Sequence, residues 1–188
     1  MKKKLNEMTL EELWQLFPIF LVPHNNLWKS WYEDESKLIL SLFQNDEIKS
    51  INHIGSTSIP NIWSKNIIDI LVTVDSVDQF KKIEEILTSN EWILMSKQDD
   101  RISFNKGYSE DGFKEKVFHL HVRLFSDQDE IYFRDYLLEH NDVAHKYETL
   151  KLSLWKKFEH DRDQYTSAKT EFIMYYTKLA KELYKDRY

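Results

Sequence analysis

The sequence predicts an α+β fold, in which a mixed β-sheet of about four or five strands is flanked by helices and followed by a C-terminal helical segment. Short runs of apolar residues, either continuous or alternating with polar ones, occupy the middle of the chain and are typical of strands. Apolar residues at helical spacing precede these runs, separate them once and continue after them. The 188 residues therefore predict one domain, with a core over about 1–125 and C-terminal helices over about 126–188.

Two helices are predicted ahead of the first strand. Thr9 and Glu12 form a capping box at the start of the first helix, and Pro18 ends it. Asn25 is the predicted N-cap of the second helix. Apolar residues recur at helical spacing in the second helix, at Leu27, Trp31, Leu38 and Leu42. Both helices are therefore predicted to be amphipathic.

A polar turn separates the first two predicted strands. The segment 48–55 predicts a strand that ends at Gly55, and the segment 66–74 predicts the next one. One face of this second strand is apolar and consists of Ile68, Ile70, Val72 and Val74. The opposite face consists of Ile67, Asp69, Leu71 and Thr73. A single acid, Asp69, thus interrupts an otherwise apolar strand.

A helix, three strands and a helical end are predicted after this strand. Ser76 and Gln79 form a capping box for a helix over 77–90. Two strands follow, over 91–97 and over 101–107, and the second closes at Gly107. A turn over 108–112 comes next, with Gly112 as the pivot. The segment 117–125 alternates, with Phe118, Leu120, Val122 and Leu124 on one face and His119, His121 and Arg123 on the other. Helices then continue to the end, with breaks near Asn141 and His160.

Composition excludes several classes of protein. The formal net charge is -6, from 26 Lys and Arg against 32 Asp and Glu, which argues against a general nucleic-acid-binding protein. The chain has no cysteine, so it has no disulfide and no thiol nucleophile, and it suits a reducing compartment. No apolar run reaches the roughly 18 residues that a membrane helix requires, and no signal peptide is expected. We therefore expect a cytoplasmic protein without a membrane partner.

The segment GSTS suits phosphate binding. A glycine at the end of a strand lets backbone N–H groups and a hydroxyl approach phosphate oxygens closely. The four candidate residues are Gly55, Ser56, Thr57 and Ser58. A Gly-Ser pair is also common in ordinary turns, so the segment alone leaves both interpretations open.

Asp69 needs a partner, because an unpaired ionised carboxylate inside an apolar strand is strongly unfavourable. One explanation is an ion pair with Lys65 or Arg123, or hydrogen bonds from Ser and Thr hydroxyls. The other is a divalent metal ion that carries a nucleoside triphosphate. The sequence alone supports both explanations about equally.

Several basic residues are further candidates. His119, His121 and Arg123 share one strand face, where they could bind metal, shuttle protons or hold phosphate, or simply form a solvated polar surface. Lys106 and Lys169 are candidate phosphate ligands by charge, although most lysines are only solvated.

The segment HIGSTSIPNIWSKNIIDI resembles the signature of the GrpB family. That signature has a His, any residue, Gly-Ser-Thr, a small residue, an apolar residue and Pro-Gly, and then an apolar stretch ending in Ala-Lys-Pro-apolar-Ile-Asp-Ile. Other segments match in the same order: FLVPHNNLWKSWYEDE, RISFNKGY, KVFHLHVRL and the helical end from FRDYLLEH to AKTEFI. The resemblance therefore covers nearly the whole chain.

The resemblance implies a nucleotidyltransferase-like fold, in which Gly-Ser precedes a strand whose acids bind a divalent metal ion. It implies that Gly55 and Ser56 bind the β and γ phosphates of a nucleoside triphosphate, while Asp69 holds Mg²⁺ or Mn²⁺ against them. An acceptor oxygen would attack the α phosphate and displace pyrophosphate. Positioning and charge neutralisation would supply most of the rate.

The chain departs from the family pattern at four positions. The superfamily has a second acid where this chain has Leu71, and a third acid on a later strand, where the chain offers His119 and His121. A two-metal site with one carboxylate is under-liganded, and an imidazole suits Mn²⁺ or Zn²⁺ better than Mg²⁺. Asn61 and Asn66 stand where the family usually has Gly and Pro, which is expected to loosen the turn.

Three functional hypotheses follow. The first is a metal-dependent nucleotidyltransferase that moves a nucleoside monophosphate to an unknown small-molecule acceptor, with Asp69 and His121 as catalytic and metal-binding residues. Its phosphate or acceptor contacts are predicted to be Gly55, Ser56, Thr57, Ser58, Lys65, Arg101, Lys106, His119, Arg123 and Lys169. The second is a non-catalytic nucleotide- or phosphometabolite-binding protein. The third is an interaction protein whose partner surface contains Trp28, Trp31 and Trp155.

Overall fold

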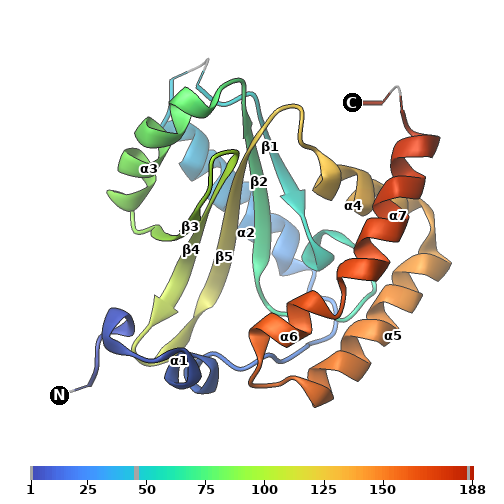
Figure 1. The fold of residues 1–188 in the computed structure, drawn as a ribbon, viewed down its shortest axis with the longest axis horizontal. Helices are drawn as coiled ribbons and strands as arrows, with labels where there is room; N and C mark the ends of the chain where they lie inside the picture. The colour runs from blue at the N-terminus through green and yellow to red at the C-terminus, as the bar shows by residue number, and fades with distance from the viewer. Residues whose placement is uncertain (1, 45–46, 186) are drawn as a thin grey trace.

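A mixed β-sheet forms the centre of the protein in the computed structural model, which describes residues 2–44, 47–185 and 187–188 (Figure 1). The sheet has five strands in the order β1-β2-β5-β4-β3. The strands are β1 (Ser50–Ile54), β2 (Ile68–Val74), β3 (Ile93–Lys97), β4 (Arg101–Ser109) and β5 (Gly112–Leu124). Strands β2 and β5 are parallel, and the other neighbours are antiparallel. The predicted α+β class is confirmed.

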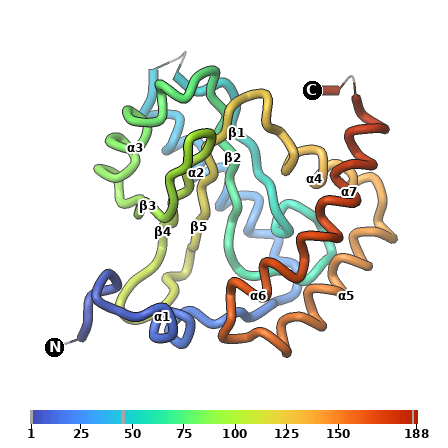
Figure 2. Tube along the Cα trace, in the orientation of Figure 1, coloured from blue at the N-terminus to red at the C-terminus, as the bar shows by residue number. Residues whose placement is uncertain are grey.

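Helices surround this sheet. The α-helices are α1 (Leu10–Leu16), α2 (Leu27–Ser41), α3 (Phe80–Thr88), α4 (Asp129–Glu139), α5 (Asn141–Lys157), α6 (Arg162–Ser167) and α7 (Thr170–Leu183). Short 3₁₀ turns are η1 (Leu5–Glu7), η2 (Ser56–Ser58) and η3 (Val77–Gln79). The C-terminal helices gather beside the β1 edge of the sheet, and α4 contacts both β1 and α7 (Figures 1 and 2). Within the described ranges, no helix combines the length and the apolar character that crossing a bilayer requires.

The predicted apolar face of β2 lies in the largest core cluster. Its members Ile68, Ile70, Val72 and Val74 pack with apolar residues of β4, β5, α2 and α3. Trp28 and Trp31 belong to the same cluster and are 0% and 8% exposed, so they stabilise the core and do not form a partner surface. A second cluster joins Ile59 and Ile62, which precede β2, to apolar residues of α4 and α5. The two clusters therefore lie on opposite sides of β2.

Local sequence signals set several element boundaries. The hydroxyl of Thr9 accepts a hydrogen bond from the backbone N–H of Glu12, and the Glu12 carboxylate accepts one from that of Thr9, as the capping box predicts. Strand β4 differs from the prediction, because it continues past Gly107. The register shifts between Lys106 and Tyr108, and Gly107 has a φ of 90° at this irregularity. The glycine is therefore part of a bulge inside the strand.

The C-terminal end also differs from its prediction. One helix was expected over 162–185, whereas the structure has α6 and α7 with a break at Ala168 and Lys169. The break redirects the chain, so that α7 packs against α4. This arrangement brings Lys169 close to the strand that contains Asp69.

Candidate functional site

The turn after β1 packs directly on Asp69. Gly55 has a φ of 69°, and a Cβ at this position would lie 2.4 Å from Oδ2 of Asp69, so only glycine fits. The hydroxyl of Ser58 donates to the carbonyl oxygen of Gly55 (2.6 Å), and Thr57 shares a hydrogen bond with Nε2 of His53 (3.0 Å). These two hydroxyls therefore stabilise the turn itself. They are not free to bind phosphate without giving up these bonds.

The two asparagines that depart from the family pattern have structural roles. Asn61 has a φ of 62°, a left-handed conformation that suits Gly and that Asn adopts more readily than most residues. The side-chain oxygen of Asn66 accepts a hydrogen bond from Nε1 of Trp28 at 2.6 Å. The turn before β2 is therefore fixed at both positions, in contrast to the loosening expected from the sequence.

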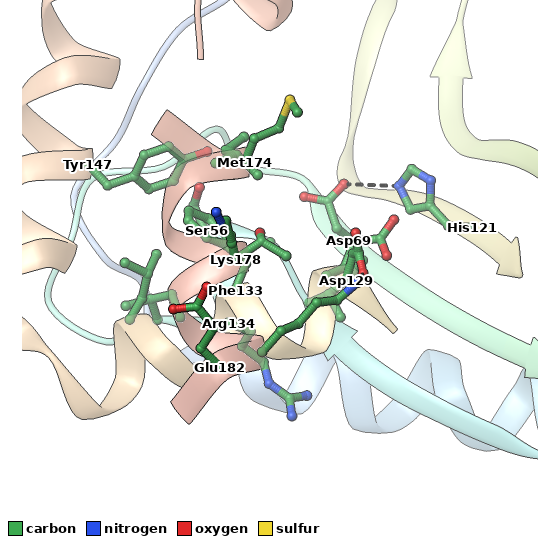
Figure 3. A pocket seen from close by; sticks show the side chains of 18 of the residues that line it. Ser56, Asp69, His121, Asp129, Phe133, Arg134, Tyr147, Met174, Lys178 and Glu182 are labelled. Atoms are coloured by element: carbon green, nitrogen blue, oxygen red, sulfur yellow. Dashed lines mark ion pairs between the residues drawn. The ribbon is translucent and has the colours of Figure 1, made fainter. Parts of the chain in front are cut away.

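Two histidines of β5 hold Asp69. The parallel register places Asp69 opposite His119, and Oδ1 of Asp69 lies 3.3 Å from Nδ1 of His119 and 3.9 Å from Nε2 of His121 (Figure 3). Burial opposes ionisation of Asp69, but the neighbouring imidazoles of His119 and His121 outweigh it and hold the pKa of Asp69 well below its usual value. In the part of the chain that the structure describes, no Lys or Arg forms an ion pair with Asp69. The predicted pairing with Lys65 or Arg123 is therefore wrong.

Hydrogen bonds link α6 to His119, the imidazole that faces Asp69. The guanidinium of Arg162 lies 3.3 Å from the hydroxyl of Tyr108, which lies 2.7 Å from Nε2 of His119. Because the ionised Asp69 only accepts, Nδ1 of His119 carries the proton, its Nε2 accepts, and the Tyr108 hydroxyl donates. Burial lowers the pKa of His119 to about 4, so this imidazole is neutral at pH 7. Arg162 therefore donates to Tyr108, Tyr108 donates to His119, and the Nδ1–H group of His119 faces Asp69.

Three lysines from separate segments converge on the same region. Lys65 precedes β2, Lys151 lies on α5 and Lys169 joins α6 to α7. Lys151 is 2% exposed, and its ammonium donates a hydrogen bond to the carbonyl oxygen of Trp63. Lys65 and Lys169 are half-buried. Each of the three is close enough to Asp69 for its pKa to respond to that charge.

The lysines also repel one another. Burial lowers the pKa of Lys65 to about 8 and those of Lys151 and Lys169 to about 7, and neighbouring cations lower all three further. Asp69 is a nearby charge that opposes this effect on every one of them. Glu148 opposes it more strongly for Lys151, whereas for Lys65 and Lys169 the opposing acid is Asp69. The pair Lys65 and Lys169 favours a bound anion.

Three predicted phosphate contacts lie away from this site. Lys106 projects from the opposite face of the sheet, where its ammonium lies 2.8 Å from Oε1 of Glu35, so its prediction is wrong. Arg101 and Arg123 are opposite each other near the far ends of β4 and β5. Both form ion pairs with Asp127, at 3.8 Å and 3.7 Å. These two arginines bind the start of the α4 segment instead of facing Asp69.

A cavity of about 810 Å³ opens beside Asp69. Gly55, Ser56, Asp69 and His121 line one end of it, and α4, α5 and α7 supply the remaining walls (Figure 3). Ser56 lies next to the phenol of Tyr147 on α5. The sequence-predicted residues Gly55, Ser56, Asp69 and His121 therefore do meet at one accessible place.

The donor set does not fit a pair of divalent ions held by the protein. Among the described residues, no three His, Asp or Glu side chains lie close enough together to hold a metal ion. Asp129 and Glu130 also line the cavity, but they form ion pairs with Lys181 and Arg123. Asp69 differs from these two acids, because its ion-pair partners are the histidines His119 and His121.

Comparison with known proteins assigns the family. A family model described as GrpB protein matches residues 18–179. The chain belongs to the GrpB family. It is 31% identical over 184 residues to UPF0157 protein YqkA of Bacillus subtilis, covering 95% of this chain and 52% of YqkA, so it spans about half of that relative. It is 31% identical over 160 residues to glutamate-rich protein GrpB of Alkalihalophilus pseudofirmus, covering 82% of this chain and 91% of that protein.

A solved structure supports the same assignment. The crystal structure of conserved protein GrpB from Enterococcus faecalis aligns with a TM-score of 0.76 at 25% identity. The alignment covers 89% of this chain and all of that one. The GrpB fold therefore extends over the sheet and the C-terminal helices alike.

Sequence reasoning missed four residues of this GrpB site: Tyr108, Tyr147, Lys151 and Arg162. Tyr147 and Lys151 lie four residues apart on the α5 face that also buries Val143. A lysine at a core position of a helix is a usable signal, because lysine is almost never fully buried without a partner. Tyr108 and Arg162 have no comparable signal, since only the folded chain brings them together.

Proposed function

We propose that this GrpB-family chain binds a nucleoside triphosphate at the polar end of the cavity and transfers the nucleoside monophosphate to a small acceptor. One observation carries the proposal: Gly55 packs a hydroxyl-bearing turn against the ionised Asp69 at the open end of the cavity, where the charges of Lys65 and Lys169 also act on this carboxylate. Triphosphate oxygens supply the anion that this arrangement lacks. The family assignment is compatible with the proposal but names no activity.

Each part of the site has a role in the proposal. Ser56 and the backbone N–H groups of η2 bind the β and γ phosphates, and Lys65 and Lys169 offset their charge. A Mg²⁺ or Mn²⁺ ion carried by the triphosphate would add charge neutralisation, with Asp69 as its protein ligand, since the proposed transfer uses His121 as a base. Asp69 is suited to this position because it stays ionised throughout the neutral pH range.

The proposed transfer needs a base near the acceptor. The acceptor oxygen forms a bond to the α phosphorus, the bond from that phosphorus to the bridging oxygen breaks, and pyrophosphate leaves with the electron pair. The acceptor proton passes to His121, which lines the cavity. Its Nε2 is directed at Asp69, which favours a proton on that nitrogen and leaves Nδ1 as the base.

Substitution of Asp69 tests the proposal. Wild-type protein is incubated with each α-labelled nucleoside triphosphate, Mg²⁺ or Mn²⁺ and a mixture of acceptors, and pyrophosphate release is followed. We expect Asp69→Asn to abolish release. Asp75→Asn is the matched control, since Asp75 follows the same strand, is 65% exposed and lies outside the cavity. Equal turnover by wild type and Asp69→Asn would refute the role of Asp69.

A second candidate function is binding without catalysis. Leu71 stands where the superfamily has an acid, and it is 0% exposed in a cluster with Ile54 and Ile131. A carboxylate is therefore replaced by a core residue. Calorimetry that detects triphosphate binding, together with no pyrophosphate release for any acceptor, would favour this function over transfer.

A further inference from the structure

Most of the surface that lines the cavity beside Asp69 is apolar. Three parts of the chain contribute apolar side chains: Ile54 and Ile59 around the turn, Phe133 and Leu137 on α4, and Ile173 and Met174 on α7. Figure 3 shows Phe133 and Met174 on the side of the cavity away from His121. The cavity therefore has a polar end at Asp69 and an apolar body between α4 and α7.

The apolar walls belong to the packed interior. Ile54, Ile59 and Leu137 are 3%, 2% and 2% exposed, so the protein folds with these side chains buried and still leaves a cavity against them. The volume of about 810 Å³ lies within the range of small-molecule sites, roughly 300–1,000 Å³. Water in an apolar cavity lacks hydrogen-bond partners, so its replacement by apolar atoms is favourable.

Charged side chains of both signs line the outer rim of the cavity, so the rim favours neither anionic nor cationic ligands. Lys178 and Lys181 of α7, and Lys185 just beyond its end, line the rim together with acids from α4 and α7. Lys181 forms an ion pair with Asp129, and Glu182 follows it on the same helix. Because both signs are present, a ligand with an uncharged body meets the least electrostatic penalty there.

We infer that the acceptor is a small molecule with an uncharged apolar body and one terminal hydroxyl. The apolar body lies between α4 and α7, and the hydroxyl lies at the polar end beside Asp69 and His121. The role of this ligand as the acceptor rests on the proposed transfer. The existence of an apolar subsite does not depend on it. Sugars and other polyols are expected to bind less tightly, since most of the lining surface is apolar and most of their hydroxyls would exchange water for carbon walls.

Straight-chain alcohols are the probes for this subsite. Binding of 1-butanol, 1-hexanol and 1-octanol to the full chain is measured by calorimetry and compared with erythritol. We expect affinity to rise about 3- to 4-fold for each added CH₂ group, and erythritol to bind less tightly than 1-hexanol. Erythritol binding as tightly as 1-hexanol, or affinity independent of chain length, would overturn the inference.

A charged substitution in the apolar wall tests where the alcohol binds. Met174 is 66% exposed, so Met174→Asp is expected to fold, and it should lower the affinity for 1-octanol at least 10-fold. Tyr175→Asp is the matched control, because Tyr175 is 59% exposed on the same helix and does not line the cavity. Equal octanol affinity in both variants would place the ligand elsewhere and overturn the inference.

A measurement on the unmutated chain tests the position of the alcohol independently. The chain has four methionines, so ¹³C-methyl labelling gives few signals. We expect 1-octanol to shift the Met174 methyl signal and leave Met95, on β3 and outside the cavity, unchanged. A shift at Met95 alone would contradict the inference.

The two proposals fail separately. Triphosphate binding to wild type and to Asp69→Asn is measured without alcohols. If alcohols bind as expected while no triphosphate binds, the proposed function fails and the apolar subsite stands. If triphosphate turns over only with polar acceptors, the proposed function stands and the inference fails.

Discussion

The contact between Gly55 and Asp69 links the turn to the candidate catalytic carboxylate. The glycine has a left-handed φ, and its Cα lies where a Cβ would touch Oδ2 of Asp69. Two separate costs thus exclude other residues, one from the backbone and one from the close approach. The position of Asp69 therefore depends on a residue that contributes no side chain.

Gly55→Ala tests this dependence. We expect a loss of about 3 kcal/mol in the free energy of unfolding, measured with urea, because backbone strain and the clash with Asp69 add. Gly112→Ala isolates the backbone cost: Gly112 has a φ of 103°, but an added Cβ would lie 3.7 Å from the carbonyl oxygen of Leu16, which is an ordinary contact. That variant should lose about 1 kcal/mol. Equal losses would show that the contact with Asp69 is unimportant.

At the residue scale, the sequence predicted the centre of the site and missed its surroundings. Gly55 and Asp69 are visible because each breaks a local rule, one in a turn and the other inside an apolar strand. Lys106 was placed wrongly because charge alone does not reveal which face of the sheet a side chain occupies next to a bulge. Arg162 was missed because its partner is 54 residues away.

Helix α6 is short, yet it connects the C-terminal helices to the sheet. Its first residue, Arg162, donates to Tyr108 of β4, which in turn orients His119 of β5. The cation also lies 5.9 Å from the centre of the Tyr108 ring. The orientation of His119, and through it of Asp69, is thus set by three different elements.

Tyr108→Phe removes this connection without changing the ring. We expect the ¹⁵N chemical shift of His119 Nε2 to change, because this nitrogen loses its donor while Nδ1 keeps its proton toward Asp69, and triphosphate affinity to fall about 5-fold, as for the loss of one hydrogen bond. Tyr184→Phe is the control, because it removes a hydroxyl that donates to Glu139 and lies outside this network. An unchanged Nε2 chemical shift in Tyr108→Phe would contradict the proposed positioning role.

At the element scale, alternation in the sequence was a reliable guide. It assigned the residues of β2 and β5 that enter the largest core cluster correctly, although β2 is buried on both faces, with Leu71 and Thr73 0% exposed. It did not predict the bulge at Gly107 or the break before α7. Both depend on contacts with segments far away in the chain, which no local pattern contains.

Folding of the whole molecule gathers three lysines with lowered pKa values around the site. The pKa of Lys65 is lowered to about 8 and those of Lys151 and Lys169 to about 7, against 10.5 for an ordinary lysine. Between pH 7 and pH 9 the unfolded chain therefore holds protons that the folded chain has released. Stability should rise with pH across this range, as it does whenever the unfolded state binds more protons.

Urea unfolding at pH 7 and pH 9 tests this pH dependence. We expect the free energy of unfolding to increase by at least about 1 kcal/mol, after allowance for the solvent exposure of Lys65 and Lys169. Lys151→Met should reduce the increase, since it removes one of the titrating groups at similar side-chain length. Lys146→Met, on the exposed side of the same helix, should leave it unchanged. Stability that falls from pH 7 to pH 9 would refute the expectation.

The parallel pairing of β2 with β5 has a consequence for synthesis on the ribosome. Asp69 meets His119 only after 50 further residues have been made, and Arg162 and Lys169 are added later still. A nascent chain that already contains the hydroxyl-rich turn therefore lacks most of the groups that surround its acid. The groups around Asp69 therefore come together only after about 100 further residues have been added beyond the acid.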